Sequence, residues 1–225
     1  MIDTTKITMT PDIKPEEKIE FDIEVSEFDQ EPAQIESEED FDEKTIMFVE
    51  RQIRNSYEYR SYIKYLKQEL DLTTCALLPN VDIKTTPVSL EFHHFPLTLF
   101  DITQIVGISM IRNVEEGDTL STLDIAEKVL LEHYKNNVGL VPVTKTIHEM
   151  AHNGSIIIPF DKINGRYDRF LETYSEEIPE GLADRIASMK IFNSSDEAIQ
   201  FNDYKLTKKI VNYNIEYLTD DNDDE

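Results

Sequence analysis

The sequence predicts an α+β fold. Apolar residues recur at helical spacing in several long segments, as at Ile46, Val49 and Ile53. Short apolar runs of strand length stand at residues 88–92, 139–143 and 155–160. The chain has 225 residues, which is enough to bury one well-packed core. We therefore expect one folded domain of helices and a few strands, with additions at its ends.

The two ends of the chain carry most of its acidity. The formal net charge is -24, from 46 acidic and 22 basic residues. Residues 1–43 hold 16 acids and three lysines with few apolar side chains, and residues 219–225 hold five acids and no base. Both are predicted to be acidic disordered tails, and the first is a candidate for binding a protein partner. Residues 44–218 retain a net charge of only -6, so this part need not repel DNA.

Other compositional features narrow the class of protein. A single cysteine, Cys75, excludes an internal disulfide and a multi-cysteine zinc site, and we expect it to be a small core residue. No stretch reaches the roughly 18 apolar residues of a membrane span, and the N-terminus lacks a signal-peptide pattern. We expect no membrane partner and a cytoplasmic location.

Residues 44–72 predict one long amphipathic helix. The segment 45–70 lacks Gly and Pro, and its apolar stripe is flanked by bases and tyrosines. Such a mixture suits contact with phosphates and stacking on bases, although a solvated helix face explains it equally well. The predicted nucleic-acid-binding residues are Arg51, Arg54, Arg60, Lys64 and Lys67.

The elements that follow are predicted from turn and cap signals. Residues 74–94 resemble a hairpin that turns at residues 79–80. Thr98 and Ser121 mark the starts of two helices, which form an insertion over residues 98–135. On the second of these helices, His133 is expected to be a surface or capping residue.

The second half of the chain is also predicted to contain both strands and helices. Residues 139–143 predict a strand, and Thr144 can cap a helix that runs to His152 and stops before Gly154. Residues 155–160 predict another strand. Residues 161–218 predict a helical C-terminal region, with helices at 166–174, 180–189 and 204–217.

Four of the five histidines fall into two clusters. His148 and His152 are four residues apart, so in a helix both imidazoles share one face and can bind one ion. His93 and His94 are adjacent, so in a strand they point to opposite sides. We predict three metal ligands, His93, His148 and His152, and assign His94 as a general base, since an imidazole titrates near neutral pH.

Residues 90–97 and 139–152 resemble the two halves of an HNH endonuclease, the ββα-metal or His-Me finger family, and are similar to HNH-like proteins of bacteriophages. The resemblance implies a ββα-metal core at residues 73–160, in which two antiparallel strands and a helix hold one divalent ion. It places His94 at the general-base position. Gly139 stands where the family has an asparagine; Asn136 and Asn137 precede it by two or three residues, and we assign Asn137 the role of orienting the base.

The function implied by this resemblance is metal-dependent hydrolysis of phosphodiester bonds in DNA by a phage-encoded endonuclease. The cofactor would be one divalent ion: Mg, Mn, Zn or Ni. Imidazole ligands favour the last three over magnesium.

Two other functions remain open. His148, Glu149 and His152 also satisfy the His-Glu-x-x-His pattern of zinc metalloproteases, in which Glu149 would activate water. Alternatively, the scaffold is catalytically inactive and binds a partner, a hypothesis favoured by Gly139 and by the negative charge. The downstream third ligand of a protease would be Glu172, Glu176 or Glu177.

Overall fold

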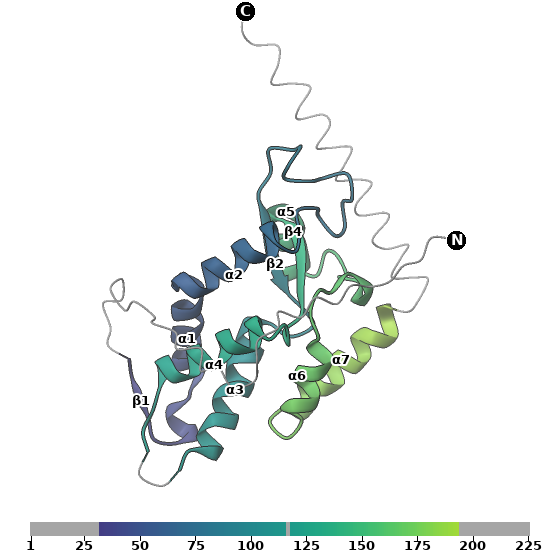
Figure 1. Cartoon of the computed structure of the whole chain (residues 1–225). Helices are drawn as coiled ribbons and strands as arrows, with labels where there is room; N and C mark the ends of the chain where they lie inside the picture. Colours follow the sequence, from purple (N-terminus) through teal and green to yellow (C-terminus); the bar gives the residue numbers. More distant parts are fainter. Residues whose placement is uncertain (1–31, 116–117, 194–225) are drawn as a thin grey trace, which may run out of the picture. The chain divides into compact units, whose positions relative to one another are not determined.

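The structure, a computed structural model, describes residues 32–115 and 118–193. Within these residues it contains seven α-helices and two two-stranded antiparallel sheets (Figure 1), which confirms the α+β class. None of the helices in this part of the chain is both long and apolar enough to cross a bilayer. The predicted helix at 204–217 and the tail at 219–225 lie outside the described residues, as do residues 1–31.

The chain forms two compact units, each assembled from several segments. We call the first the helical unit; its described part comprises residues 32–71, 97–139 and 165–177, without 116–117. The second, the ββα unit, comprises residues 72–96, 140–164 and 178–193.

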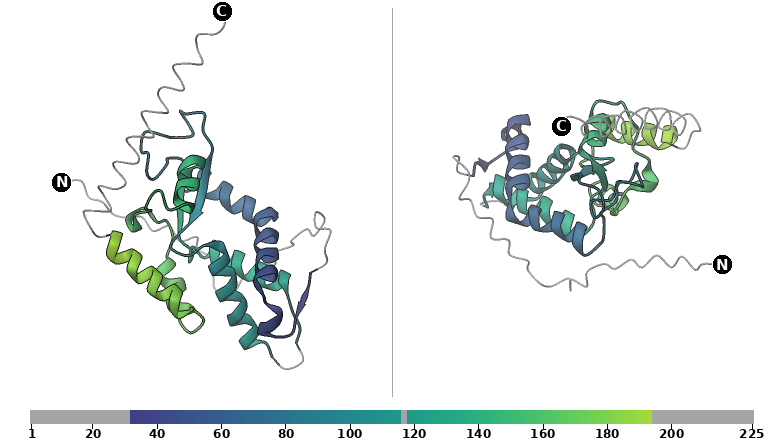
Figure 2. Two further views of the ribbon diagram at one scale, coloured as in Figure 1. Left: turned by 180° about the vertical axis from the view of Figure 1, so that it is seen from behind. Right: turned by 90° about the horizontal axis from the view of Figure 1, so that it is seen from above.

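Three helices form the centre of the helical unit. Helices α1 (Glu43–Asn55), α3 (Leu99–Asn113) and α4 (Thr122–Tyr134) pack against one another, as both views of Figure 2 show. Their apolar stripes meet in a core that excludes water. The fully buried members of this core include Val49, Ile53, Ile105, Val106, Ile125, Ala126, Val129 and Leu130.

Both inserted helices begin where their cap signals predict. Thr98 caps α3 and Ser121 caps α4, and each forms a capping box with an aspartate three residues later. The Thr98 hydroxyl accepts from the backbone N–H of Asp101 at 3.1 Å, and the Ser121 hydroxyl accepts from that of Asp124 at 3.3 Å. These starts are set by local hydrogen bonds, which explains why the sequence alone located them.

The prediction of one helix over residues 44–72 is wrong, because the chain breaks at Ser56. Helix α1 ends at Asn55 and α2 (Tyr57–Gln68) begins at Tyr57. The Ser56 hydroxyl donates to the Ile53 carbonyl at 2.8 Å and accepts from the backbone N–H of Tyr59 at 3.1 Å. One serine therefore closes the first helix and caps the second, a break that needs neither glycine nor proline.

Residues 32–43, the described part of the predicted N-terminal tail, are ordered. Strand β1 (Gln34–Ile35) pairs with β3 (Leu120–Ser121), and Ile35 and Phe41 are buried. The two apolar side chains give this acidic segment enough buried surface to order it against the helical unit.

In the ββα unit, strand β2 (Leu90–His94) pairs antiparallel with β4 (Leu140–Thr144) and helix α5 (Lys145–His152) packs on both (Figure 1). Helix α7 (Glu180–Asn193) contributes Met189 to the edge of the core, which confirms the helix predicted at 180–189. The buried core residues are Cys75, Leu90, Phe95, Val141, Val143, Ile147, Ile156 and Ile158. Cys75 is thus the small core residue expected from its sequence.

Two predicted strands of this unit are absent from the described structure. Residues 74–78 do not form a strand: around the predicted turn at 79–80 there is one isolated antiparallel bridge, between Thr74 and Asp82. The Asp82 carboxylate holds this short turn by accepting from the Thr73 and Thr74 hydroxyls and from the Lys84 N–H. Residues 155–160 are irregular, although Ile156 and Ile158 both enter the core. Their alternation reflects burial and not strand pairing.

His133 is the residue whose environment differs most from its prediction. It is completely buried rather than at the surface, with its ring edge-on to Tyr59 and Tyr62 of α2. Its Nδ1 lies 2.8 Å from the Val129 carbonyl oxygen, one turn earlier in α4. Burial lowers the pKa of His133 to about 4, because the charged imidazolium would lose its hydration.

Helix α6 (Tyr167–Thr173) confirms the helix predicted at 166–174, and a tight backbone approach precedes it. Gly165 has a φ of +105°, and a Cβ at this position would lie 1.9 Å from the Val138 carbonyl oxygen. On both counts only glycine fits here.

We expect Gly165→Ala to lower the free energy of unfolding by about 3 kcal/mol, through backbone strain and steric overlap. The matched control is Gly181→Ala in α7, where a Cβ meets no atom within 4 Å and where alanine should be neutral or stabilise by about 0.5 kcal/mol. Urea denaturation measures both changes. Equal effects in the two variants would contradict the close approach at Gly165.

His133 should make the fold sensitive to acid. Because the pKa of His133 is lower in the folded chain than its ordinary value of about 6.5, its contribution to stability is complete above pH 6.5 and is lost as the pH falls toward 4. We expect the native chain to lose about 3 kcal/mol from this residue over that range. His133→Gln, which cannot titrate there, should show a correspondingly shallower fall in stability when denaturation is measured at each pH. If stability falls with pH equally in the native chain and in His133→Gln, then folding does not lower the pKa of His133.

Candidate metal centre

Strand β2 places two polar side chains on its α5 side. Residues two apart in a strand share a face, so Glu91 and His93 project together. The register of the sheet sets His93 opposite Val141 of β4. Both polar residues contact α5, Glu91 through His148 and His93 through both helix histidines.

Helix α5 supplies the other two imidazoles. It begins directly after β4, where the Thr144 hydroxyl accepts from the Ile147 N–H at 3.4 Å. Ile147 is completely buried and anchors the helix on the sheet. His148 and His152 follow one turn apart, as predicted, and their Nε2 atoms lie 3.0 Å from each other.

The three histidines converge on one point. One ring nitrogen from each of His93, His148 and His152 lies within 4.8 Å of the others. The ring centroid of His93 lies 5.0 Å from that of His148 and 4.9 Å from that of His152. Tetrahedral Zn–N bonds of about 2.0–2.1 Å separate ligand nitrogens by about 3.3 Å, so small side-chain adjustments bring this set to coordination distance.

Glu91 adds a carboxylate behind His148. Its Oε2 lies 2.5 Å from the Nδ1 of His148. An Nδ1–H that donates to Glu91 leaves the Nε2 lone pair directed at the other two imidazoles. This is the carboxylate–histidine arrangement that orients metal-binding histidines in proteins.

Glu91 was not among the residues predicted from the sequence. A signal was present, since Glu91 precedes His93 by two residues and so shares its strand face. Its partner, His148, lies 57 positions further along the chain, and only the folded register brings the two together.

The burial of His93 suits a ligand rather than a charged group. The surrounding protein and then the neighbouring His148 and His152 rings lower the pKa of His93 to about 4. Its imidazole is therefore neutral at pH 7, with a lone pair available. Its buried Nδ1 has no hydrogen-bond partner within the described residues, which is uncommon for a buried polar atom; the donor set therefore fits a metal ion.

The centre has a closed side and an open side. His93 is buried, His148 is half-buried and His152 is exposed. Structural zinc sites have four protein ligands, whereas catalytic sites keep a position for water or substrate. In the described part of the chain three residues make up the group, so the arrangement leaves room for a further ligand on the exposed side.

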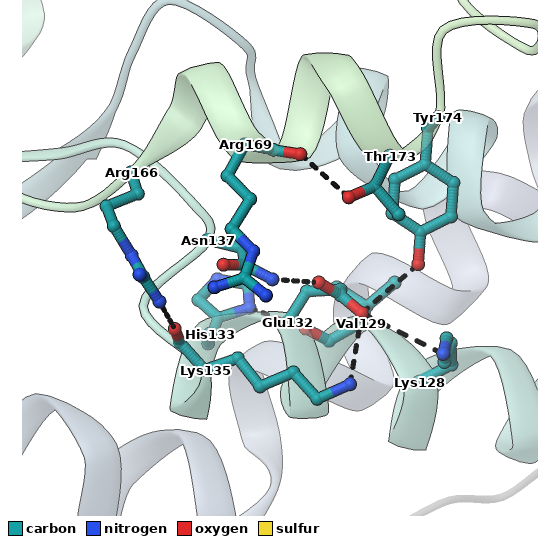
Figure 3. Close-up of polar contacts among 10 residues, drawn as sticks. All are labelled: Lys128, Val129, Glu132, His133, Lys135, Asn137, Arg166, Arg169, Thr173 and Tyr174. Atoms are coloured by element: carbon teal, nitrogen blue, oxygen red, sulfur yellow. Dashed lines mark hydrogen bonds and ion pairs between the residues drawn. The ribbon is translucent and has the colours of Figure 1, made fainter. Parts of the chain in front are cut away.

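The two predicted catalytic residues lie in different units. His94 ends β2 opposite Leu140 and is only 6% exposed. Asn137 belongs to the helical unit, where its Nδ2 donates to the Glu132 carboxylate at 2.7 Å (Figure 3). The predicted role of Asn137 in orienting His94 stays a prediction.

Glu132 is the centre of the polar cluster that holds Asn137. Its side chain is buried, and the Tyr174 hydroxyl donates to it at 3.1 Å (Figure 3). The ammonium groups of Lys128 and Lys135 each lie 3.8 Å from the same carboxylate oxygen. Burial first, and then the Glu132 charge, raise the pKa of Tyr174. The cluster joins the end of α4 to the end of α6 and fixes the amide orientation of Asn137.

The other predicted residues are not members of the histidine group, and those of helices α1 and α2 belong to the helical unit. Arg51, Arg54, Arg60 and Lys64 are exposed on α1 and α2, and Lys67 is half-buried. Glu149 is exposed on α5. The third member of the group with His148 and His152 is His93, and the group does not include the downstream glutamates 172, 176 and 177.

Comparison with known proteins gives one family. The model of the bacteriophage G278-like virion protein family matches residues 1–220, and the chain belongs to this family. Neither the curated proteins nor the solved structures compared with the chain give a match. The expected bacteriophage origin is confirmed, and the chain is a virion protein; a cytoplasmic location in the host stays a prediction.

We expect the native chain to bind one Zn²⁺ or Ni²⁺ at pH 7.5 in isothermal titration calorimetry. His148→Ala should abolish this binding, and Glu91→Gln should weaken it by about 10- to 100-fold because His148 loses its orienting carboxylate. Glu149→Gln, an exposed change on the same helix, is the matched control and should leave the affinity unchanged. A native chain without a site that depends on His148 would contradict the assignment.

Proposed function

We propose that this virion protein is a metal-dependent hydrolase of phosphodiester bonds in DNA, with its centre in the ββα unit. The observation that carries the proposal is the convergence of His93, His148 and His152 from β2 and α5, with Glu91 behind His148 and one side open. The ββα arrangement of these elements agrees with the HNH resemblance, which assigned the same three ligands.

The chain's own residues would divide the work of hydrolysis. A divalent ion held by the three imidazoles would act as a Lewis acid on the scissile phosphate. His94 would accept a proton from the attacking water as the new P–O bond forms and the bond to the leaving sugar oxygen breaks, and that oxygen takes a proton from solvent. Glu91 would keep the His148 ring oriented throughout.

The position of His94 also favours the second candidate, an inactive scaffold with a metal ion in a virion protein. A general base must reach the reacting water, yet His94 is 6% exposed. In the nuclease proposal, water reaches this ring at the end of β2. In the scaffold proposal, His94 is a core residue and the ion serves the architecture of the unit.

A plasmid-nicking assay separates the two candidates. The native chain should nick supercoiled DNA with Mn²⁺, Ni²⁺ or Zn²⁺, and His94→Ala should lower the rate by about 100-fold or more while metal binding persists. His148→Ala should lose both nicking and metal binding. Glu149→Gln controls for a change on α5 and should retain activity.

Other outcomes of the assay are equally definite. A native chain that binds metal but nicks DNA with none of the ions tested would support the scaffold. Nicking that is unaffected by His94→Ala would refute the base assignment. Casein cleavage that Glu149→Gln abolishes, with His94→Ala still active, would support the protease.

A further inference from the structure

We propose that the outer face of α1 and α2 binds unpaired nucleotides, with Tyr57 as the stacking surface and Arg51, Arg54, Arg60 and Lys64 as phosphate contacts. This surface, the α1–α2 face, lies in the helical unit. It shares no residue with the metal centre, so binding and hydrolysis are separable by experiment.

The exposed charges of this face are basic, although the chain as a whole is strongly acidic. The whole sequence has a net charge of -24. From residue 51 to residue 68, however, every exposed charged side chain is basic. The one acid within that range, Glu58, is buried, and Glu50 just before it is paired with Arg54 at 3.4 Å. The exposed acids Glu69 and Asp71 follow only after α2 ends. Arg51, Arg60 and Lys64 therefore give the stretch between residues 51 and 68 a positive exposed surface that suits a polyanion.

Tyr57 distinguishes this face from an ordinary solvated helix. It is 71% exposed, whereas Tyr59 and Tyr62 of the same helix are buried against His133. An aromatic ring left in water gains nothing for folding, but it offers a flat surface on which a base can stack. Its position as the first residue of α2 keeps it at the break between the two helices.

In α2 the helical spacing places two cations on the same face as the ring. Tyr57, Arg60 and Lys64 are at positions i, i+3 and i+7 of α2, and so share one face. Arg51 and Arg54 are three apart near the end of α1 and share a face in the same way. A base stacked on Tyr57 would bring a neighbouring phosphate toward Arg60 and Lys64, and the strand would continue along α1 toward Arg51 and Arg54.

The exposed ring favours single strands over duplexes. In a duplex the bases are stacked on each other and their faces are not available to a side chain. In a single strand each base has a free face, and stacking on an aromatic residue contributes independently of sequence. Lys and Arg alone would bind either form through the phosphates.

The test measures binding of a labelled oligo-dT and of a matched duplex to the full chain by fluorescence anisotropy, in EDTA and over a range of salt. The native chain should prefer the single strand. Tyr57→Ala should weaken single-strand binding by about tenfold, while Tyr57→Phe, which keeps the ring, should bind within about twofold of native. The helix cap, Ser56, is untouched by both changes.

The salt dependence tests the phosphate contacts separately. In single-strand binding, each Lys or Arg that neutralises a phosphate adds about 0.7 to the steepness of log K against log salt. Arg60→Gln combined with Lys64→Gln should therefore reduce this steepness by about 1.4. The matched control is Lys84→Gln with Lys162→Gln, two exposed lysines of the ββα unit, which should leave it unchanged. Circular dichroism checks that each variant is folded.

Three outcomes would overturn the proposal. If the chain does not bind oligonucleotides at low salt, the face does not bind nucleic acid, and an acidic protein surface becomes the alternative partner. Equal binding of duplex and single strand, with no effect of Tyr57→Ala, would remove the stacking role. If both double variants show the same salt dependence, Arg60 and Lys64 do not contact the phosphates. None of these results bears on metal binding or nicking, which the metal centre determines.

Discussion

The antiparallel pairing of β2 with β4 is the constraint on which the candidate centre depends. The two strands are separated in sequence by residues 95–139, so their pairing closes a long loop and costs conformational entropy. Burial of Leu90, Val141 and Val143 against Ile147 offsets that cost. The register then fixes what the chemistry needs, because a slip by one residue would turn His93 to the other face of the sheet. Strand β4 runs directly into α5, so no linker loosens the position of His148.

Burial, more than net charge, sets the electrostatic character of each unit. The composition describes a strongly acidic protein, yet its two candidate functional surfaces consist of a group of imidazoles and of a set of exposed cations. His93 and His133 both have a pKa of about 4 for the same primary reason, loss of hydration. In His93 the neutral ring is available to a metal ion, whereas in His133 it is packed between tyrosines. The same physical shift thus supports a binding role in one unit and core packing in the other.

The sequence located the elements and residues whose determinants are local. Caps placed the starts of α3, α4 and α5, and the i, i+4 spacing placed His148 beside His152. What it could not locate depends on partners far along the chain. Glu91 acquires its meaning only from the β2–β4 register, and His133 is buried because α2 covers it. The break at Ser56 is local, but a serine is compatible with either a continuous helix or a cap, and tertiary packing decides between them.

The number of ligands bears on whether an ion at this centre would serve architecture or chemistry. An ion held only for stability is usually enclosed by four protein ligands. In the described residues the group consists of three histidines, and the last of them, His152, is exposed. A purely architectural ion would therefore need its remaining ligand from water or from another molecule. The Glu91 carboxylate would hold the His148 ring in the orientation that a bound ion requires. The geometry of the ββα unit is thus easier to account for as a centre that receives a ligand than as one that only holds the fold together.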